Sequence, residues 1–166
     1  MKRVLGIDPG LASTGWGIVE TDGSRYRYLD AGVIRTPASL PIGERLVIIY
    51  NDVRNRIDSY APDGAGVEQL YFARNATSGI PVAHARGVVF LALAQAGVPT
   101  GEYPPQAIKK AIVGVGRADK AQVQELVRVL LGLAEVPRPD HASDALAAAI
   151  CHITTTAIQE RSEHVQ

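Results

Sequence analysis

Hydrophobic and polar positions divide the chain into a first part with the pattern of strands and a second part with mainly helical periods. Residues 4–7 form a short apolar run that ends at Asp8 and a Pro-Gly turn, which is typical of a core strand. Residues 15–20 and 25–35 continue the strand pattern after turns at Pro9-Gly10 and Asp22-Gly23. Short turns between successive strands favour antiparallel pairing, so we predict three antiparallel strands at the start of the chain.

The second part of the chain alternates helices with short strands. After Pro41, the apolar residues Leu46, Ile49, Val53 and Ile57 recur on one face of a predicted helix. The remaining predicted elements are strands at 64–68 and 98–103 and helices at 87–94, 106–113, 120–131 and from residue 140 onward. We therefore predict one mixed α/β domain over residues 1–158, with a five-stranded sheet and helices on both faces. The polar residues 159–166 are expected to form a disordered C-terminal tail.

A glycine stands two residues before an acid at the end of two predicted strands. Gly6 precedes Asp8, and Gly66 precedes Glu68. Because strand side chains alternate between faces, each glycine lies on the same face as its acid. If the two strands are neighbours, Asp8 and Glu68 converge, and the glycines leave room for another element to pack closely.

The alanine-rich segment from Asp140 to Ile150 is the candidate for that element. His141 and Asp144 are three residues apart and share one face of the predicted helix. Three carboxylates and a histidine then meet at one place. Ionised carboxylates packed together repel one another unless a cation lies among them, so this set predicts a divalent metal site.

Each of these residues also has a simpler structural explanation. Asp8 is suited to a turn before Pro-Gly, and Glu68 to a solvated strand end. Asp140 is suited to the N-cap of the last helix, Asp144 to its first turn, and His141 to its surface. These explanations do not predict the repeated glycine-acid spacing together with the alanine-rich helix.

Five separated blocks of sequence, in order along the chain, resemble the RuvC family of bacterial Holliday junction resolvases. The blocks are residues 6–17, 67–76, 106–109 with 113–116, 120–124 and 144–147. The resemblance implies a ribonuclease H-like fold and a structure-specific endonuclease that resolves four-way DNA junctions by paired, symmetric, metal-dependent nicks in homologous recombination and DNA repair. It also implies two divalent ions per subunit, Mg²⁺ or Mn²⁺, held by Asp8, Glu68, His141 and Asp144.

The resemblance extends to the residues that contact DNA. Lys109 and Lys120 match the family's DNA-contacting lysines, and we expect Lys120 also to help neutralise the charge that develops at the cleavage site. Tyr71 matches the aromatic residue that stacks on an unpaired base near the cleavage site. Arg74 and Arg117 are further candidate DNA contacts, Arg74 just after this aromatic residue and Arg117 after the Gly-rich turn at 114–116.

The distribution of charge agrees with a phosphodiester substrate although the formal net charge is zero. A neutral chain is not a generally basic nucleic-acid binder. Residues 69–131, however, carry seven basic residues against three acidic ones. Basic residues near an acidic metal centre share the charge of the DNA backbone with the metal. Ordinary solvated helix faces are the alternative explanation.

His141 departs from the pattern most often associated with the family, which has a fourth carboxylate at this position. Some family members carry histidine here. The neighbouring Asp140 is a poor substitute, because one residue along a helix rotates a side chain by about 100°. Imidazole is a softer ligand than carboxylate, so we expect His141 to favour Mn²⁺ over Mg²⁺.

The helix predicted at 87–94 is apolar all round, whereas a surface helix of a small domain normally has a polar face. A symmetric homodimer would cover its second side, and RuvC-like proteins are homodimers paired through this region. A four-way junction has two-fold symmetry, so two related sites would cut two like strands. A central helix buried within one chain is the alternative. The resemblance also implies a partnership with the RuvA–RuvB branch-migration complex.

Composition indicates a cytoplasmic protein without a membrane segment. Cys151 is the single cysteine and cannot form an internal disulfide, which fits a reducing compartment. The apolar run after Met1-Lys2-Arg3 is interrupted at Asp8, and the run at 88–94 is far shorter than a membrane span.

Two other functions fit part of the pattern. An ATP-handling domain of the actin and sugar-kinase type uses a similar first strand and Asp-x-Gly turn, but it needs two such domains and a second Gly-rich phosphate turn. A module of the same fold that binds branched DNA without cutting it would follow if His141 had replaced an essential ligand.

Overall fold

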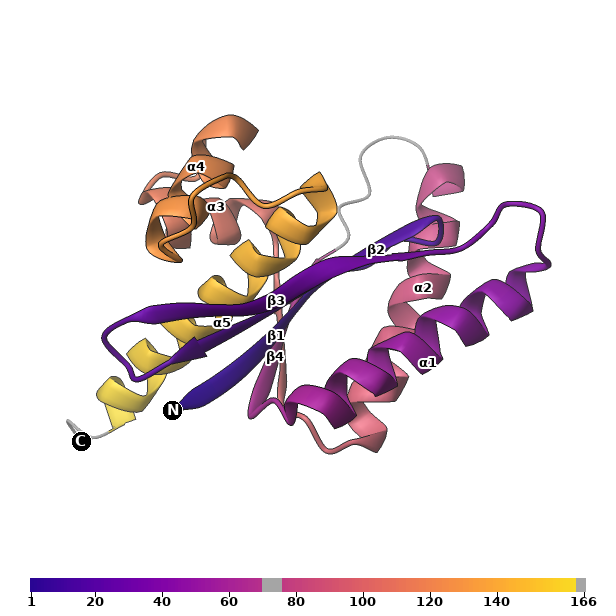
Figure 1. Ribbon diagram of the computed structural model, residues 1–166, viewed down its shortest axis with the longest axis horizontal. Coiled ribbons are helices and arrows are strands. Elements are labelled where there is room, and N and C mark those ends of the chain that lie inside the picture. The colour runs from indigo at the N-terminus through magenta and orange to yellow at the C-terminus, as the bar shows by residue number, and fades with distance from the viewer. Residues whose placement is uncertain (70–75, 164–166) are drawn as a thin grey trace.

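The computed structural model describes residues 1–69 and 76–163 of the chain (Figure 1). Its strands are β1 (Lys2–Asp8), β2 (Ser13–Thr21), β3 (Tyr26–Arg35), β4 (Gly64–Glu68) and β5 (Thr100–Tyr103). Its helices are α1 (Ile42–Tyr60), α2 (Ala76–Gln95), α3 (Pro105–Val113), α4 (Lys120–Leu130) and α5 (Asp140–Glu163). The predicted order of strands and helices is confirmed, with shifts of a few residues at most boundaries, but α2 begins at Ala76, well before the predicted start at residue 87.

The five strands form one mixed sheet in the order β3-β2-β1-β4-β5. β1, β2 and β3 are antiparallel neighbours, as predicted, while β4 runs parallel to β1 and β5 parallel to β4. β4 therefore lies directly beside β1, which is the neighbour relation that brings the ends of these two strands together. The mixed α/β fold with helices on both faces is confirmed.

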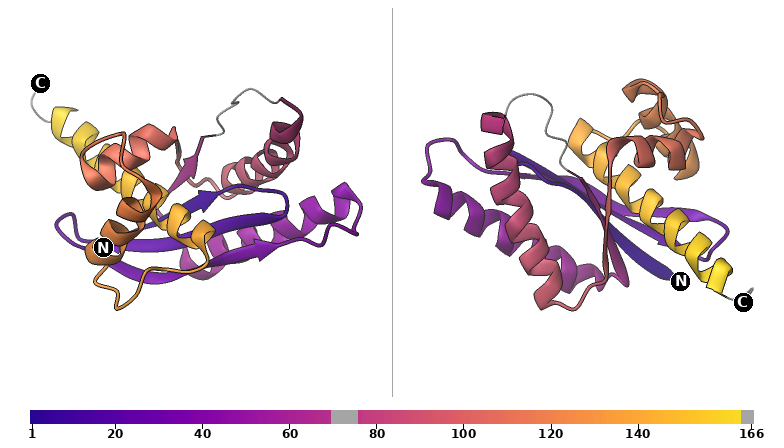
Figure 2. Two further views of the ribbon diagram at one scale, coloured as in Figure 1. Left: turned by 90° about the horizontal axis from the view of Figure 1, so that it is seen from above. Right: turned by 180° about the vertical axis from the view of Figure 1, so that it is seen from behind.

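Helices cover both faces of the sheet (Figures 1 and 2). On one face, α1 and α2 pack against a core that includes Leu5 and Ile7 of β1. On the other face, α5 packs against a core that includes Val4, with α3 and α4 packed on α5. The alternation of side chains along β1 thus determines which residues meet which helices, and it turns Asp8 toward the α5 side.

The contact between α5 and the sheet is made by backbone as much as by side chains. A Cβ atom added at Gly6 would lie 1.8 Å from the carbonyl oxygen of Ala145, and one at Gly66 would lie 2.4 Å from that of Ala148. Both glycines of the repeated glycine-acid pattern therefore admit the helix, as the sequence predicted. No side chain, even alanine, fits at these positions without moving α5.

One expectation from the sequence needs correction. α5 continues to Glu163, so residues 159–163 of the expected disordered tail are helical, while 164–166 lie outside the described residues. The ion pair between Lys2 of β1 and Glu160 of α5, with 2.6 Å between Nζ and Oε1, fastens this last part of the helix to the sheet. The alternative in which the apolar helix is enclosed within one chain is also wrong. Val89 is fully buried, whereas Ile80 is 53% and Leu91 50% exposed, so one side of α2 remains uncovered.

None of the helices in the described ranges contains a long enough apolar stretch to cross a membrane.

Replacing Gly6 with alanine should destabilise the fold strongly, because the new methyl group overlaps a backbone oxygen that cannot move without shifting α5. We expect Gly6→Ala to lower the free energy of unfolding by about 3 kcal/mol or more, measured by urea denaturation. Gly43→Ala on α1 is the control, because a Cβ atom there meets no atom within 4 Å and should cost nothing. Equal stability of Gly6→Ala and wild type would contradict the close packing of α5.

Candidate metal centre

Asp8 and Glu68 stand at the same end of two neighbouring parallel strands. In the register of β1 and β4, Gly6 is paired with Gly66 and Ile7 with Val67, so the acids that follow are adjacent. Both strands end here, which leaves the two side chains at the edge of the sheet. The first turn of α5 passes over this edge.

His141 and Asp144 approach from that first turn of α5. His141 Nδ1 lies 2.8 Å from Asp8 Oδ2. Asp8, His141 and Asp144 each have a potential ligand atom, and these three atoms lie within 4.8 Å of one another. One residue of β1 and two residues of α5, more than 130 positions apart in the sequence, thus form a compact group.

Glu68 completes this group from β4. Burial, then the negative charge of Asp8 and a hydrogen bond with it, raises the pKa of Glu68 to about 8. Burial and the charge of Asp8 also raise the pKa of Asp144. Both shifts arise first from burial and then from the negative charge of neighbouring carboxylates. Carboxylate oxygens and an imidazole are suitable ligands for Mg²⁺ or Mn²⁺, so these residues fit a divalent ion.

His141 is held by the acids around it. Its hydrogen bond with Asp8 raises the pKa of the imidazole, and the charges of Asp8 and Asp144 act in the same direction. Asp140, one residue earlier, is turned away from this group. Its carboxylate lies 2.8 Å from Arg138 Nη1 and 3.5 Å from Lys120 Nζ.

Among the ion pairs that the structure describes, Lys120 is the cation that pairs with Asp144. Its Nζ is 3.2 Å from Asp144 Oδ2. Burial opposes the charged form, but the carboxylates of Asp144 and Asp140 outweigh it and raise the pKa of Lys120. Lys120 is the first residue of α4, which begins with a capping box in which Asp119 and Gln122 each accept a backbone N–H of the other. The cap fixes where the helix starts and therefore where Lys120 stands.

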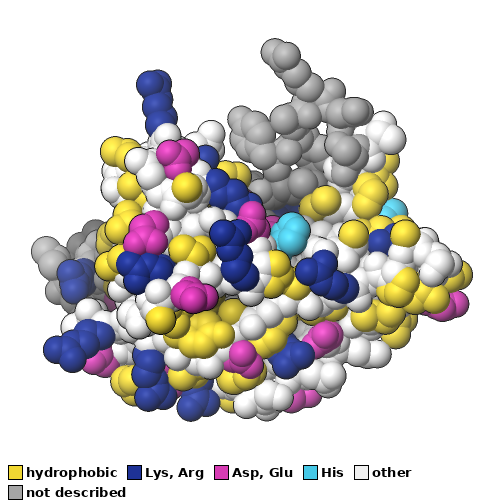
Figure 3. Space-filling model, turned by 45° about the horizontal axis from the view of Figure 1, so that its top comes forward, with side chains coloured by type: hydrophobic (Ala, Val, Ile, Leu, Met, Phe, Trp, Pro, Cys, Tyr) yellow, Lys and Arg dark blue, Asp and Glu magenta, His cyan; other side chains and the backbone are white. Residues whose placement is uncertain are grey.

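The other candidate DNA contacts differ in their placement. Lys109 of α3 lines a pocket of about 260 Å³ together with Glu68, Lys120 and Asp144. Arg117 is exposed in the connection between α3 and α4. Figure 3 shows basic side chains beside acidic side chains and a histidine on this face of the molecule. Tyr71 and Arg74 lie outside the described residues.

Sequence reasoning missed the part that β2 plays in forming the site. A Cβ atom at Gly15 would lie 1.9 Å from the carbonyl oxygen of His141, so Gly15 admits the start of α5. Gly15 is paired with Asp8, and Gly17 with Gly6, across β1 and β2. The signal was present in the sequence, because Gly15 and Gly17 repeat the two-residue glycine spacing on the strand next to β1.

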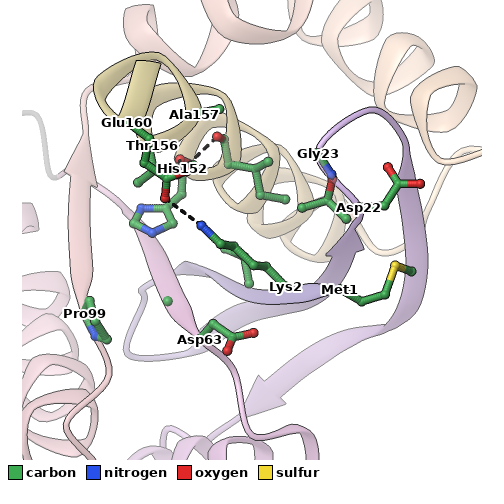
Figure 4. Close-up of a pocket in the computed structure, with 14 residues that line it drawn as sticks. Met1, Lys2, Asp22, Gly23, Asp63, Pro99, His152, Thr156, Ala157 and Glu160 are labelled. Atoms are coloured by element: carbon green, nitrogen blue, oxygen red, sulfur yellow. Dashed lines mark hydrogen bonds and ion pairs between the residues drawn. The ribbon is translucent and has the colours of Figure 1, made fainter. Parts of the chain in front are cut away.

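A larger cavity of about 620 Å³ lies near the start of β1 and the later turns of α5, away from the acidic group. Figure 4 shows Lys2 and Glu160 extending toward each other there, with the ring of His152 nearby. His152 is buried, and its Nδ1 lies 2.9 Å from the hydroxyl of Tyr103. None of the four residues of the metal centre lines this cavity.

Comparisons with known proteins agree with this geometry. Residues 4–152 match the family model described as crossover junction endodeoxyribonuclease RuvC. The crossover junction endodeoxyribonuclease RuvC of Chloroflexus aggregans is 54% identical over 159 residues, which cover 96% of this chain and 97% of that protein.

Solved structures show the same fold. The structure of T. thermophilus RuvC in complex with Holliday junction substrate superposes with a TM-score of 0.92 at 36% identity, covering 96% of this chain and 97% of the other. The Fowlpox virus resolvase bound to Holliday junction DNA shares the fold alone, with a TM-score of 0.60 at 11% identity and coverage of 92% and 99%. With an acidic group at its strand ends, a family match along most of its length and a relative of more than half identity, the chain belongs to the RuvC family of crossover junction endodeoxyribonucleases.

Proposed function

We propose that the chain resolves four-way DNA junctions by hydrolysing phosphodiester bonds at the centre formed by Asp8, Glu68, His141 and Asp144. The convergence of Asp8, His141 and Asp144 from β1 and α5, with Glu68 of β4 hydrogen-bonded to Asp8, is the observation that carries this proposal. Two divalent ions per subunit, Mg²⁺ or Mn²⁺, are the cofactors that such a group of acids would hold.

The roles of the residues follow from their positions. Bound ions would activate a water molecule and stabilise the leaving 3′ oxygen during in-line displacement at phosphorus. Asp8, Glu68 and Asp144 supply the negative oxygen ligands, and the hydrogen bond between Asp8 and His141 fixes the orientation of the imidazole ring. Lys120, charged and beside Asp144, is placed to contact the phosphate and to balance its developing charge.

Residues around the centre would bind the junction. Lys109 and Lys120 line the pocket that contains Glu68 and Asp144, so a phosphate there would meet both lysines. Arg117 and Arg74 would add contacts to the DNA backbone, and Tyr71 would stack on an unpaired base. The complex of T. thermophilus RuvC with a Holliday junction substrate supports the same class of substrate for this chain.

Two copies of the chain would act together. The uncovered side of α2, with Ile80 and Leu91 half exposed, is suited to pairing with a second copy. A homodimer has the two-fold symmetry of the junction and would make paired, symmetric nicks. We further propose that the RuvA–RuvB branch-migration complex is its partner in the cytoplasm, where the chromosomal DNA is found.

A supercoiled plasmid that extrudes a cruciform tests both cleavage and pairing of the nicks. We expect the wild-type protein with Mn²⁺ to yield linear DNA, because both strands are cut before the complex dissociates. Asp144→Asn should slow cleavage by at least about 100-fold, since it removes a charged ligand. Asp58→Asn, the same change at an exposed acid on α1, should not alter the rate. Nicked circles alone would contradict paired cutting, and junction binding without cleavage in either metal would contradict the nuclease assignment.

The metal preference tests the place of His141. We expect the wild-type protein to cleave a labelled four-way junction faster with Mn²⁺ than with Mg²⁺, because imidazole is a softer ligand than carboxylate. His141→Asp should lower the ratio of the two rates by about threefold or more. An unchanged ratio would show that His141 does not contact the ion.

The pH dependence of stability tests the crowding of Glu68. Its pKa is raised from 4.5 to about 8 in the folded chain, so folding favours the protonated form. Without divalent ions, its contribution to stability is therefore full below pH 4.5 and is lost as the pH rises toward 8. An ion offsets the charge of the ionised form, so Mn²⁺ should raise the Tm more at pH 8 than at pH 5, by roughly 5 °C or more. Glu68→Gln should remove most of this difference between the Tm shifts at pH 8 and pH 5. The same pH difference in Glu68→Gln and in the wild-type protein would contradict the prediction.

A further inference from the structure

Arg86 is a largely buried cation that lies behind the metal centre. It stands on α2, and its side chain is 15% exposed. The guanidinium group lies over the ring of Phe90, 5.1 Å from the ring centroid. An arginine packed in this way is pre-organised for hydrogen bonding, because its planar donors have little freedom left.

The guanidinium joins the ends of two neighbouring strands. Nη1 donates a hydrogen bond to the backbone carbonyl of Glu68 at 2.8 Å. Nη2 forms an ion pair with the carboxylate of Glu102 on β5. Glu68 is the last residue of β4, and the N–H of Gln69 donates to the carbonyl of Tyr103 at 2.7 Å, so Arg86 acts at the point where the chain leaves the sheet.

We propose that Arg86 is a positioning residue that fixes the backbone of Glu68 so that its carboxylate faces Asp8 and Asp144. This inference rests on the proposed nuclease function. Arg86 forms none of the described ion pairs with the acids of the centre and acts through the carbonyl of Glu68. Crowded carboxylates repel, and β4 has only five residues to resist that repulsion. A shift of about 1 Å at a catalytic group can reduce the rate by about 100-fold.

The surroundings of Arg86 argue against a direct contact with DNA. A phosphate contact needs an accessible guanidinium, whereas Arg86 is only 15% exposed, packed on Phe90 and bonded to both Glu68 and Glu102. The residue therefore serves the geometry of the centre rather than the binding of the substrate.

Arg86→Gln and Arg86→Lys test this role in the full-length protein with a labelled four-way junction. We expect Arg86→Gln to lower the single-turnover rate by about 10- to 100-fold at saturating Mn²⁺ and to raise the Mn²⁺ concentration needed for half the maximal rate. Junction affinity without divalent ions should stay within about twofold of wild type, because DNA contacts are unchanged. Arg86→Lys keeps the charge and one donor, so its rate should be intermediate.

Arg56→Gln is the matched control. Arg56 also lies over an aromatic ring, 4.3 Å from the centroid of Trp16, and pairs with an acid, Asp52, at 2.9 Å. Its loss should lower stability as much as the loss of Arg86 and leave the cleavage rate unchanged. Suppose that the two variants lose the same stability and that Arg56→Gln loses as much rate as Arg86→Gln. Arg86 would then have only a general structural role, and the inference would be overturned.

A double variant separates the remaining outcomes. If Arg86 acts through Glu68, adding Arg86→Gln to Glu68→Gln should lower the residual rate no further. The inference alone would be overturned if the two substitutions lowered the cleavage rate independently in the double variant. A wild-type rate in Arg86→Gln, or a loss of junction affinity that accounts for its lower rate, would also overturn it. Absence of cleavage by the wild-type protein would instead overturn the proposed function, and the inference with it.

Discussion

The contact between the backbone of α5 and the backbone of the sheet is the constraint on which the site depends. Gly6, Gly15 and Gly66 have no side chains, so the carbonyl oxygens of α5 occupy the space that a Cβ atom would need. This contact brings the first turn of α5 over the ends of β1 and β4. The position of His141 and Asp144 beside Asp8 is a consequence of that approach, and a side chain at any of the three glycines would separate them.

The close packing of α5 on the sheet crowds carboxylates together, and nearby cations offset only part of their repulsion. Asp8, Glu68 and Asp144 lie together in a partly buried group, and the pKa values of Glu68 and Asp144 are raised. Lys120 offsets some of the negative charge from one side, and Arg86 holds the backbone of Glu68 from another. A divalent ion held by these residues would supply positive charge, so the same crowding that weakens the ion-free fold would favour ion binding.

The sequence predicted the order of the elements and the proximity of Asp8, Glu68, His141 and Asp144 because each depends on a short, regular pattern. Alternation placed Asp8 on the face of Gly6, and the helical period placed His141 and Asp144 together. Arg86 could not be predicted in this way, since its partner is a backbone carbonyl 18 residues earlier that has no sequence signature. Composition also does not show that α5 continues to Glu163, where Glu160 pairs with Lys2, 158 positions away. The roles of Tyr71 and Arg74 stay predictions.

Diffraction from crystals of the protein soaked in Mn²⁺, recorded near the manganese absorption edge, would show whether Asp8, Glu68 and Asp144 bind a metal ion together. We expect anomalous density among the carboxylates of Asp8, Glu68 and Asp144, with at least one peak within about 2.6 Å of their oxygen atoms. Absence of density there in fully soaked crystals, with the ion bound elsewhere or not at all, would contradict it.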